Sequence, residues 1–471
     1  MSTASQQTIQ ALEQVVKNLP VGTNLALLQL MWAMLNGSFL RSRGAVHGAL
    51  AESGYTEGQI RRSWQALRYG VWSIRELILH WRHLVLTAGR WQVHKYEGYH
   101  PLAVDITAFW RPRLQGWMGK FFHGLANRAV KAVGFGVITQ VGEVDGQRLP
   151  LIKRIIRVKT DEMSEAELRA DILHQVPYHL CEQEVFVHDA GVSLAEVQAA
   201  RIPRFVIRLA VNCTGRRNYL PLPKKKGRPA EYGLKVRPLP RRRAGNDISA
   251  TAPDFETSFQ YDERTIKVKG WPDLVRPDQK VAAENERFTI LVFSDPLYQD
   301  PLVIGTNLSA QPKTIFRLYL DRWPVEQPPL VAKQMLGLQR QFVFAPVSCH
   351  RLPELALLTG NILTYLAATL PPFPTGFWDR HPKKRRDDYG EPWARLIFPK
   401  ITRFTDDFEK SSLFQPIYPK EFMLIDELND NDKPIWLVFG LICAHIVKVL
   451  SFKAKLWCFD LASFWQGVSG N

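Results

Sequence analysis

The feature that most constrains the fold is a series of short segments rich in β-branched residues between residues 100 and 211. LAVDITAF (102–109), VGFGVITQV (133–141) and LPLIKRIIRV (149–158) are predicted strands, and the turn sequence GEVDGQ separates the last two. SEAELRADILHQV (164–176) is a predicted helix, followed by the strand EVFVH, the short helix SLAEVQAAR and the strand RFVIRLAV. Three strands followed by helix, strand, helix and strand predict a mixed sheet covered by helices, an α/β arrangement.

Residues 1–95 are predicted to form an all-α domain, because apolar residues recur there at helical spacing. A short helix, a turn at Gly54 and a second helix that opens at Thr56 resemble a helix-turn-helix, and Gln59 stands at the capping-box distance from Thr56. On that reading, polar side chains of the second helix reach DNA phosphates or base edges, and the alternative is a helical hairpin that only packs. These side chains are Gln59, Arg61, Arg62, Gln65 and Arg68.

The remaining chain divides by composition. Residues 96–210 form the first part of the α/β core, and 211–310 are a basic, Pro-rich insertion with later β character. A helical segment at 311–345 completes the core, and 346–471 are predicted to be helical, with a basic turn at 381–390.

The charge balance favours a polyanionic partner. The chain has 61 Lys and Arg against 45 Asp and Glu, a formal net charge of +16. The apolar runs at 25–35 and 435–450 are too short or too polar to span a bilayer, and no signal peptide precedes them, so we expect a cytoplasmic protein associated with the bacterial nucleoid. The five cysteines lack metal-ligand or disulfide-framework spacing.

Two aspartates stand in apolar strand contexts. Asp105 lies between Val104 and Ile106, and Asp189 ends the apolar strand EVFVH. A buried carboxylate is costly unless it is paired, hydrogen-bonded or bound to a metal. Each aspartate alone is also compatible with a structural hydrogen-bond acceptor, and the neighbouring His188 is expected to be a packing or hydrogen-bonding residue.

A third carboxylate stands in YLDRWPVEQPPLVAK, where Tyr319, Arg322, Glu326 and Lys333 follow the spacing Tyr-x2-Arg-x3-Glu-x6-Lys. On a helix with about 100° per residue these four side chains fall within one stripe about 60° wide. A solvated face with i,i+4 charge pairs is the alternative to a functional stripe.

The same spacing resembles the signature of IS4-family transposases, whose glutamate is the third catalytic carboxylate. From about residue 100 to 340 the chain looks like this family, with Asp105 and Asp189 matching its two aspartates and Glu326 its glutamate. Tyr319, Arg322 and Lys333 match the other signature residues. The resemblance implies a ribonuclease-H-like mixed sheet with an inserted β-rich region, preceded by an all-α DNA-binding domain and followed by a helical C-terminal region.

One departure from the family concerns backbone geometry. Pro324, Pro328 and Pro329 interrupt a helix that family members keep continuous. The helix is therefore predicted to kink or to restart near Pro328, which would leave Glu326 just outside a helix N-terminus.

The resemblance implies a cut-and-paste DNA transposase. Asp105, Asp189 and Glu326 would hold two Mg²⁺ ions, which Mn²⁺ can replace, because hard cations prefer oxygen ligands. Water would nick DNA at the terminal inverted repeats, and the released 3′-hydroxyl would attack either the opposite strand, forming a hairpin, or target DNA. Arg322 and Lys333 would contact phosphates that Tyr319 helps to position, and a homodimer would hold two double-stranded transposon ends.

The insertion offers further DNA contacts. Its basic residues are expected to bind phosphates independently of sequence; they are Lys224, Lys225, Lys226, Arg228, Arg241, Arg242 and Arg243. In hairpin-forming relatives an aromatic residue of the insertion stacks on a flipped base, and Trp271 is the first candidate here, with Tyr298 second. Alternatively, Trp271 belongs to a small core.

Two other functions share parts of this pattern. A nuclease of the same fold, such as a junction resolvase, would use the same acidic residues and metals. An inactive or domesticated relative would bind DNA without cutting it.

Overall fold

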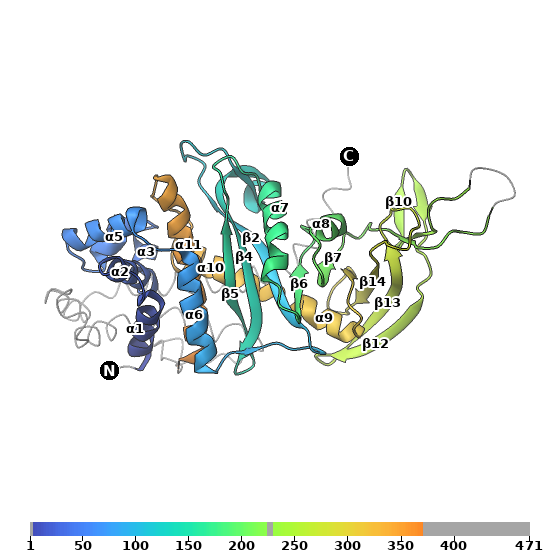
Figure 1. The fold of residues 1–471 in the computed structure, drawn as a ribbon, viewed down its shortest axis with the longest axis horizontal. Helices are drawn as coiled ribbons and strands as arrows, with labels where there is room; N and C mark the ends of the chain where they lie inside the picture. The colour runs from blue at the N-terminus through green and yellow to red at the C-terminus, as the bar shows by residue number, and fades with distance from the viewer. Residues whose placement is uncertain (1–2, 224–228, 371–471) are drawn as a thin grey trace.

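The fold is built on a large mixed β-sheet. The computed structural model describes residues 3–223 and 229–370, and in these ranges thirteen strands share one sheet (Figure 1). Its central order is β5-β4-β2-β6-β7. The pairs β5–β4 and β4–β2 are antiparallel, and the pairs β2–β6 and β6–β7 are parallel. The α/β class predicted from the sequence is confirmed.

The strands and helices of this central part follow the predicted order, with a short extra strand, β3. The strands are β1 (Gln92–Val93), β2 (His100–Trp110), β3 (Lys120–His123), β4 (Arg128–Val144), β5 (Gln147–Arg157), β6 (Glu184–His188) and β7 (Phe205–Arg208). The helices between them are α7 (Glu165–Gln175), which a 3-10 turn at Val176–His179 extends, and α8 (Leu194–Ala199). β4 and β5 join through Asp145 and Gly146, both at positive φ, as expected of a two-residue hairpin turn.

Helices cover both faces of the sheet. Asp105 pairs with Val137 on one face, and the next pair, Ile106 and Gly136, belongs to the opposite face. The side chain of Ile172 on α7 occupies the space above Gly136, so α7 covers the face that Asp105 does not use. Figure 1 shows α6 and α11 on the other side of β4 and β5.

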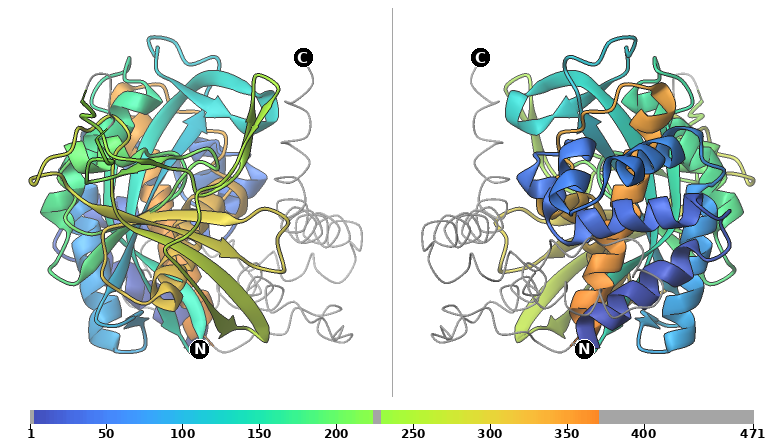
Figure 2. Two further views of the ribbon diagram at one scale, coloured as in Figure 1. Left: turned by 90° about the vertical axis from the view of Figure 1, so that its right-hand side faces the viewer. Right: turned by 90° about the vertical axis from the view of Figure 1, so that its left-hand side faces the viewer.

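The predicted all-α beginning is present as six helices. They are α1 (Thr3–Val16), α2 (Thr23–Leu35), α3 (Ser38–Arg41), α4 (Val46–Glu52), α5 (Glu57–Tyr69) and α6 (Ile74–Ala88). α2 is the apolar run at 25–35, and it is buried. The N-terminal helices lie beside α11 (Pro346–Thr369), as the right-hand view of Figure 2 shows.

The predicted helix-turn-helix layout corresponds to α4, a turn with Gly54 at positive φ, and α5. The capping box of Thr56 and Gln59 is confirmed. The side chain of Gln59 is buried, so the prediction that it reaches DNA is wrong. Arg61, Arg62 and Arg68 are exposed.

Most strands of the insertion extend the main sheet. The strands of the insertion are β8 (Gly215–Arg217), β9 (Lys235–Val236), β10 (Arg241–Arg243), β11 (Asn246–Ile248), β12 (Phe255–Tyr261), β13 (Arg264–Val275), β14 (Phe288–Ser294) and β15 (Leu302–Thr306). β10 and β11 form a separate two-stranded sheet. β15 pairs antiparallel with β7, and β14 and β13 follow it outward. Residues 211–310 are thus continuous with the core.

The last 101 residues of the chain, 371–471, lie outside the described ranges, and so do the basic turn at 381–390 and the apolar run at 435–450. Of the C-terminal region predicted to be helical, α11 is described and is a helix. No helix within the described residues is long and apolar enough to cross a membrane.

Candidate active site

Asp105 lies near the middle of β2, on the face opposite to α7. Its Oδ1 accepts a hydrogen bond from the N–H of Ile106 at 2.9 Å. Burial and the negative charge of Glu326 raise the pKa of Asp105 to about 7, against a smaller lowering by Arg322, and Asp189 raises it further. Glu326 and Asp189, from distant parts of the sequence, therefore both lie close enough to Asp105 to act on its charge.

Asp189 directly follows β6, the parallel neighbour of β2. Its Oδ1 accepts hydrogen bonds from the hydroxyl of Tyr319 at 3.1 Å and from the N–H of Ala190 at 2.8 Å. Burial alone would raise the pKa of Asp189, but Arg322, the Ala190 N–H and Arg208 together lower it. Asp189 is thus held as a carboxylate.

The segment that carries Glu326 is broken as the prolines predict. α9 (Pro312–Leu320) is followed by a 3-10 turn (Trp323–Glu326), the short helix α10 (Gln327–Leu330) and a π-helical turn (Val331–Met335). Glu326 immediately precedes α10, whose first turn contains Pro328, so the predicted restart is confirmed. Arg322, with φ −66° and ψ −39°, keeps right-handed helical geometry, whereas Asp321, at the end of α9, has φ −75° and ψ 5°. The segment is therefore a series of short helical pieces and not one continuous helix.

Arg322 lies between two of the carboxylates. Its Nη1 donates to Glu326 Oε1 at 2.7 Å, and its Nη2 lies 3.6 Å from Asp189 Oδ2. The side chain is buried, yet these two carboxylates and Tyr319 raise its pKa despite the opposing effect of burial. Arg322 therefore neutralises part of the negative charge of the site.

Lys333 lies further along the same face of β2. Its Nζ donates to Thr107 Oγ1 at 2.7 Å and lies 4.7 Å from the centre of the Trp110 ring. Burial lowers the pKa of Lys333 to about 8, partly offset by the charge of Asp105. The six residues singled out by the sequence thus come together at one site.

The oxygen-only donor set of Asp105, Asp189 and Glu326 suits a hard divalent cation. The pKa of Asp105 is raised mainly by burial and then by the charge of Glu326, and a bound cation would favour the carboxylate form. Within residues 3–223 and 229–370, however, no three acidic, His or Cys side chains converge closely enough to hold an ion as they stand. In the structure as it stands, Glu326 is engaged by Arg322 at 2.7 Å.

His188 is buried and does not face the carboxylates as a ligand. Its Nδ1 lies 2.9 Å from the backbone oxygen of Asp189, and its ring stacks on Phe186. The packing and hydrogen-bonding role expected for His188 is what the structure shows.

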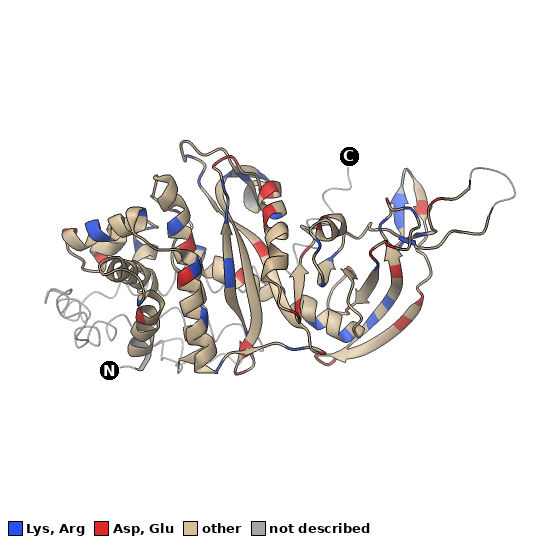
Figure 3. Ribbon diagram, viewed as in Figure 1, with Lys and Arg blue, Asp and Glu red and all other residues tan. Residues whose placement is uncertain are grey.

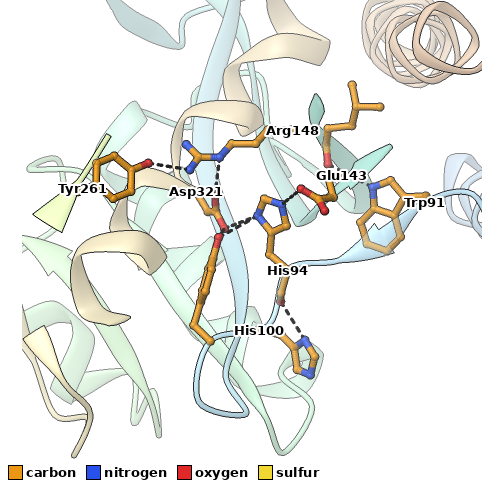
Figure 4. Close-up of polar contacts among 9 residues, drawn as sticks. Trp91, His94, His100, Glu143, Arg148, Tyr261 and Asp321 are labelled. Carbon is orange, nitrogen blue, oxygen red and sulfur yellow. Dashed lines mark hydrogen bonds and ion pairs between the residues drawn. The ribbon is translucent and has the colours of Figure 1, made fainter. Parts of the chain in front are cut away.

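A second polar network, which no sequence pattern predicted, surrounds Asp321 (Figure 4). Asp321, the residue before Arg322, is completely buried. His94 Nδ1 lies 2.7 Å and the donating Tyr96 hydroxyl 2.8 Å from its Oδ2, and Arg148 Nε lies 3.4 Å from its Oδ1. Residues before β2 and on β5 therefore fix the start of the segment that bears Arg322 and Glu326.

Trp271 corrects one prediction. Its side chain is 1% exposed, and its Nε1 donates to the Ala252 oxygen at 2.9 Å, so it forms part of the core under β13 and offers no face for base stacking. Tyr298 is 50% exposed in the β14–β15 loop. Trp323, which no sequence pattern singled out, is 46% exposed, and the Arg322 guanidinium lies 4.6 Å from its ring centre.

The structure describes some of the basic residues of the insertion that were predicted to bind phosphates. Arg241, Arg242 and Arg243 form β10, which Figure 3 shows as a blue segment at the far end of the insertion. Arg242 makes a long, exposed ion pair with Asp247, at 3.9 Å. Lys224, Lys225, Lys226 and Arg228 lie outside the described residues.

Comparison of the chain with known protein families gives no match, and comparison with curated protein sequences gives none either. The site itself therefore has to carry the functional conclusion.

Proposed function

We propose that this chain is a DDE-type DNA transposase that resembles the IS4 family. The observation that carries the proposal is the convergence of Asp105, Asp189 and Glu326 from β2, the end of β6 and the proline-broken helix. Their mutual influence is visible in the raised pKa of Asp105. An ordinary solvated helix face gives no reason for Tyr319, Arg322 and Lys333 to contact Asp189, Glu326 and Thr107.

The strand order supports the proposal. β5-β4-β2-β6-β7, antiparallel on one side of β2 and parallel on the other, is the order expected of a ribonuclease-H-like core. In that arrangement carboxylates on the first strand, after the fourth strand and on a later helix meet at one edge, which matches where Asp105, Asp189 and Glu326 lie.

Asp105, Asp189 and Glu326 would hold divalent metal ions, with Mg²⁺ as the expected species. Bound there, the ions would activate the attacking oxygen and stabilise the leaving oxygen of a phosphodiester. Arg322 would then be released from Glu326 to bind a DNA phosphate, and Lys333 would bind another from its position over Thr107. Tyr319, which donates to Asp189, would keep that carboxylate oriented.

With this machinery, water would cut the strand at a transposon end and the 3′-hydroxyl would attack a second phosphodiester. Two ends must be held together for joining, so we propose a homodimer on double-stranded DNA. Arg61, Arg62 and Arg68 on α5 are exposed and would contribute to end binding.

The test uses purified full-length protein and linear DNA that carries the repeats flanking its gene. Nicking or joining at the ends that requires Mg²⁺ supports the proposal. Cutting of branched DNA without end specificity would identify a resolvase-like nuclease, and binding without cutting in Mg²⁺ and in Mn²⁺ would identify an inactive relative.

Trp323 gives a prediction within this function. Trp323→Ala should lower end cleavage about ten-fold, because the ring supports Arg322 and its exposed part can stack on an unpaired base, worth about 1–3 kcal/mol. The half-exposed ring adds little to folding, so Tm should stay close to that of the wild type. Cleavage rates and thermal melts measure the two effects, and Trp323→Phe should recover much of the activity. Unchanged cleavage by Trp323→Ala would remove Trp323 from the site.

A further inference from the structure

The face of β2 that carries Asp105 continues beyond Lys333. Side chains alternate along a strand, so Asp105, Thr107, Phe109 and Arg111 share one face. The Arg111 N–H donates to the Lys131 oxygen at 2.8 Å, which prolongs the β2–β4 ladder past Trp110 and keeps the alternation. Arg111 therefore lies about 13 Å from Thr107 along the strand, at about 3.3 Å per residue.

Arg111 is a buried cation without an acidic partner in the described part of the chain. Its side chain is 7% exposed, and its Nη1 donates a long hydrogen bond of 3.5 Å to the Cys349 sulfur. Burial lowers the pKa of Arg111, and no carboxylate contributes to that shift. Burying a guanidinium costs free energy unless an anion compensates it, and a thiol is a weak acceptor.

An exposed aromatic ring lies next to this cation. Phe344, which precedes α11, is 70% exposed, and the Arg111 guanidinium lies 5.4 Å from its ring centre. Most of this ring therefore stays in contact with solvent in the folded chain. A cation beside an exposed aromatic ring is the combination that binds the phosphate and the base of an unpaired nucleotide.

We propose that Arg111 and Phe344 extend the DNA-binding surface of the site, with Arg111 on a backbone phosphate and Phe344 stacked on an unpaired base. The proposal rests on the proposed function, because it places a strand that runs from the carboxylates past Lys333. The spacing of about 13 Å corresponds to about four nucleotides at 3.4 Å per step. A DNA strand supplies both anion and stacking base in one polymer.

The experiment compares two fluorescent probes by anisotropy in a chelator. One is a blunt duplex of about 20 base pairs, and the other has the same duplex with a single-stranded tail of about 10 nucleotides. Phe344→Ala should bind the tailed probe about five-fold more weakly and the blunt probe equally well. Arg111→Met should reduce the salt dependence of tailed-probe binding by about one phosphate contact and leave Tm equal or higher, because it removes an uncompensated buried charge.

Matched controls separate the surface from general effects. Tyr178→Ala removes an aromatic side chain that is 77% exposed elsewhere, and Arg154→Met removes a cation from the opposite face of the sheet. Neither should change the preference for the tailed probe. If Phe344→Ala and Arg111→Met keep that preference while the wild type cuts transposon ends, this inference is wrong and the proposed function stands. If the wild type binds neither probe, both fail, and if the variants alter only self-association in sedimentation, the surface is a protein interface instead.

Discussion

Asp105→Asn is expected to abolish metal-dependent cleavage of DNA ends and to raise the Tm of the metal-free protein at pH 8. Loss of cleavage follows because asparagine is a poorer ligand for a divalent cation than a carboxylate. The gain in stability follows because the substitution removes a negative charge that burial and Glu326 disfavour in the folded state. A catalytic residue that destabilises its own fold gives these opposite effects.

The pH dependence has a definite sign. The pKa of Asp105 is about 7 in the folded protein and 3.8 by its ordinary value, so between these pH values the folded state binds the extra proton. The stability associated with this proton is complete below about pH 4 and is lost as the pH rises through 7. The difference in Tm between Asp105→Asn and the wild type should therefore be small near pH 4 and grow to several degrees at pH 8, in thermal melts with a chelator.

Glu354 provides the matched control. It is buried, and burial raises its pKa to about 7 against the lowering effect of Arg157, but it lies on α11 and is not among the site carboxylates. Glu354→Gln should alter the pH dependence of stability in the same window and leave cleavage intact. Cleavage by Asp105→Asn at the wild-type rate would show that the site is assigned wrongly.

Asp321→Ala is expected to lower the free energy of unfolding by on the order of 3 kcal/mol, because it removes a fully buried carboxylate that accepts from neighbouring polar groups. The substitution leaves His94, Tyr96 and Arg148 without their common acceptor. Urea titrations followed by circular dichroism measure the loss.

The conservative variant Asp321→Asn separates the effect on stability from the effect on the position of Arg322. Asp321→Asn keeps an acceptor for the Tyr96 hydroxyl and should lose less stability, yet cleavage should still fall because Arg322 follows directly in the chain. Glu143→Ala is the control, since Glu143 is 47% exposed and meets His94 at 3.3 Å, and its effect should stay within about 1 kcal/mol. A loss of stability by Asp321→Ala no larger than that of Glu143→Ala would contradict the network.

The parts of the site that the sequence predicted are those encoded locally. Tyr319, Arg322, Glu326 and Lys333 share one short segment, so residue type and spacing could be compared with a helix. The prolines showed where that helix breaks. Asp105 and Asp189 could be placed on strands because their apolar neighbours define those strands.

The parts that escaped prediction depend on contacts between distant segments. No sequence pattern distinguishes Asp321 from its polar neighbours, and only the fold brings His94 and Arg148 to it. Trp271 and Trp323 could not be told apart by residue type, because burial under β13 or exposure beside Arg322 depends on packing. The pairing of β15 with β7 could not be predicted either, because the composition of a strand does not determine which strand it pairs with.

That pairing makes the region between residues 211 and 310 a permanent neighbour of the core. A deletion that removed it would leave β7 with a row of unsatisfied N–H and C=O groups, and bare edges of this kind recruit strands from other molecules. Chains shortened in this way are expected to aggregate, whatever happens to their affinity for DNA. The basic residues of β10 are free to change during evolution. β14 and β15 must be kept, because they cover the edge of the sheet at β7.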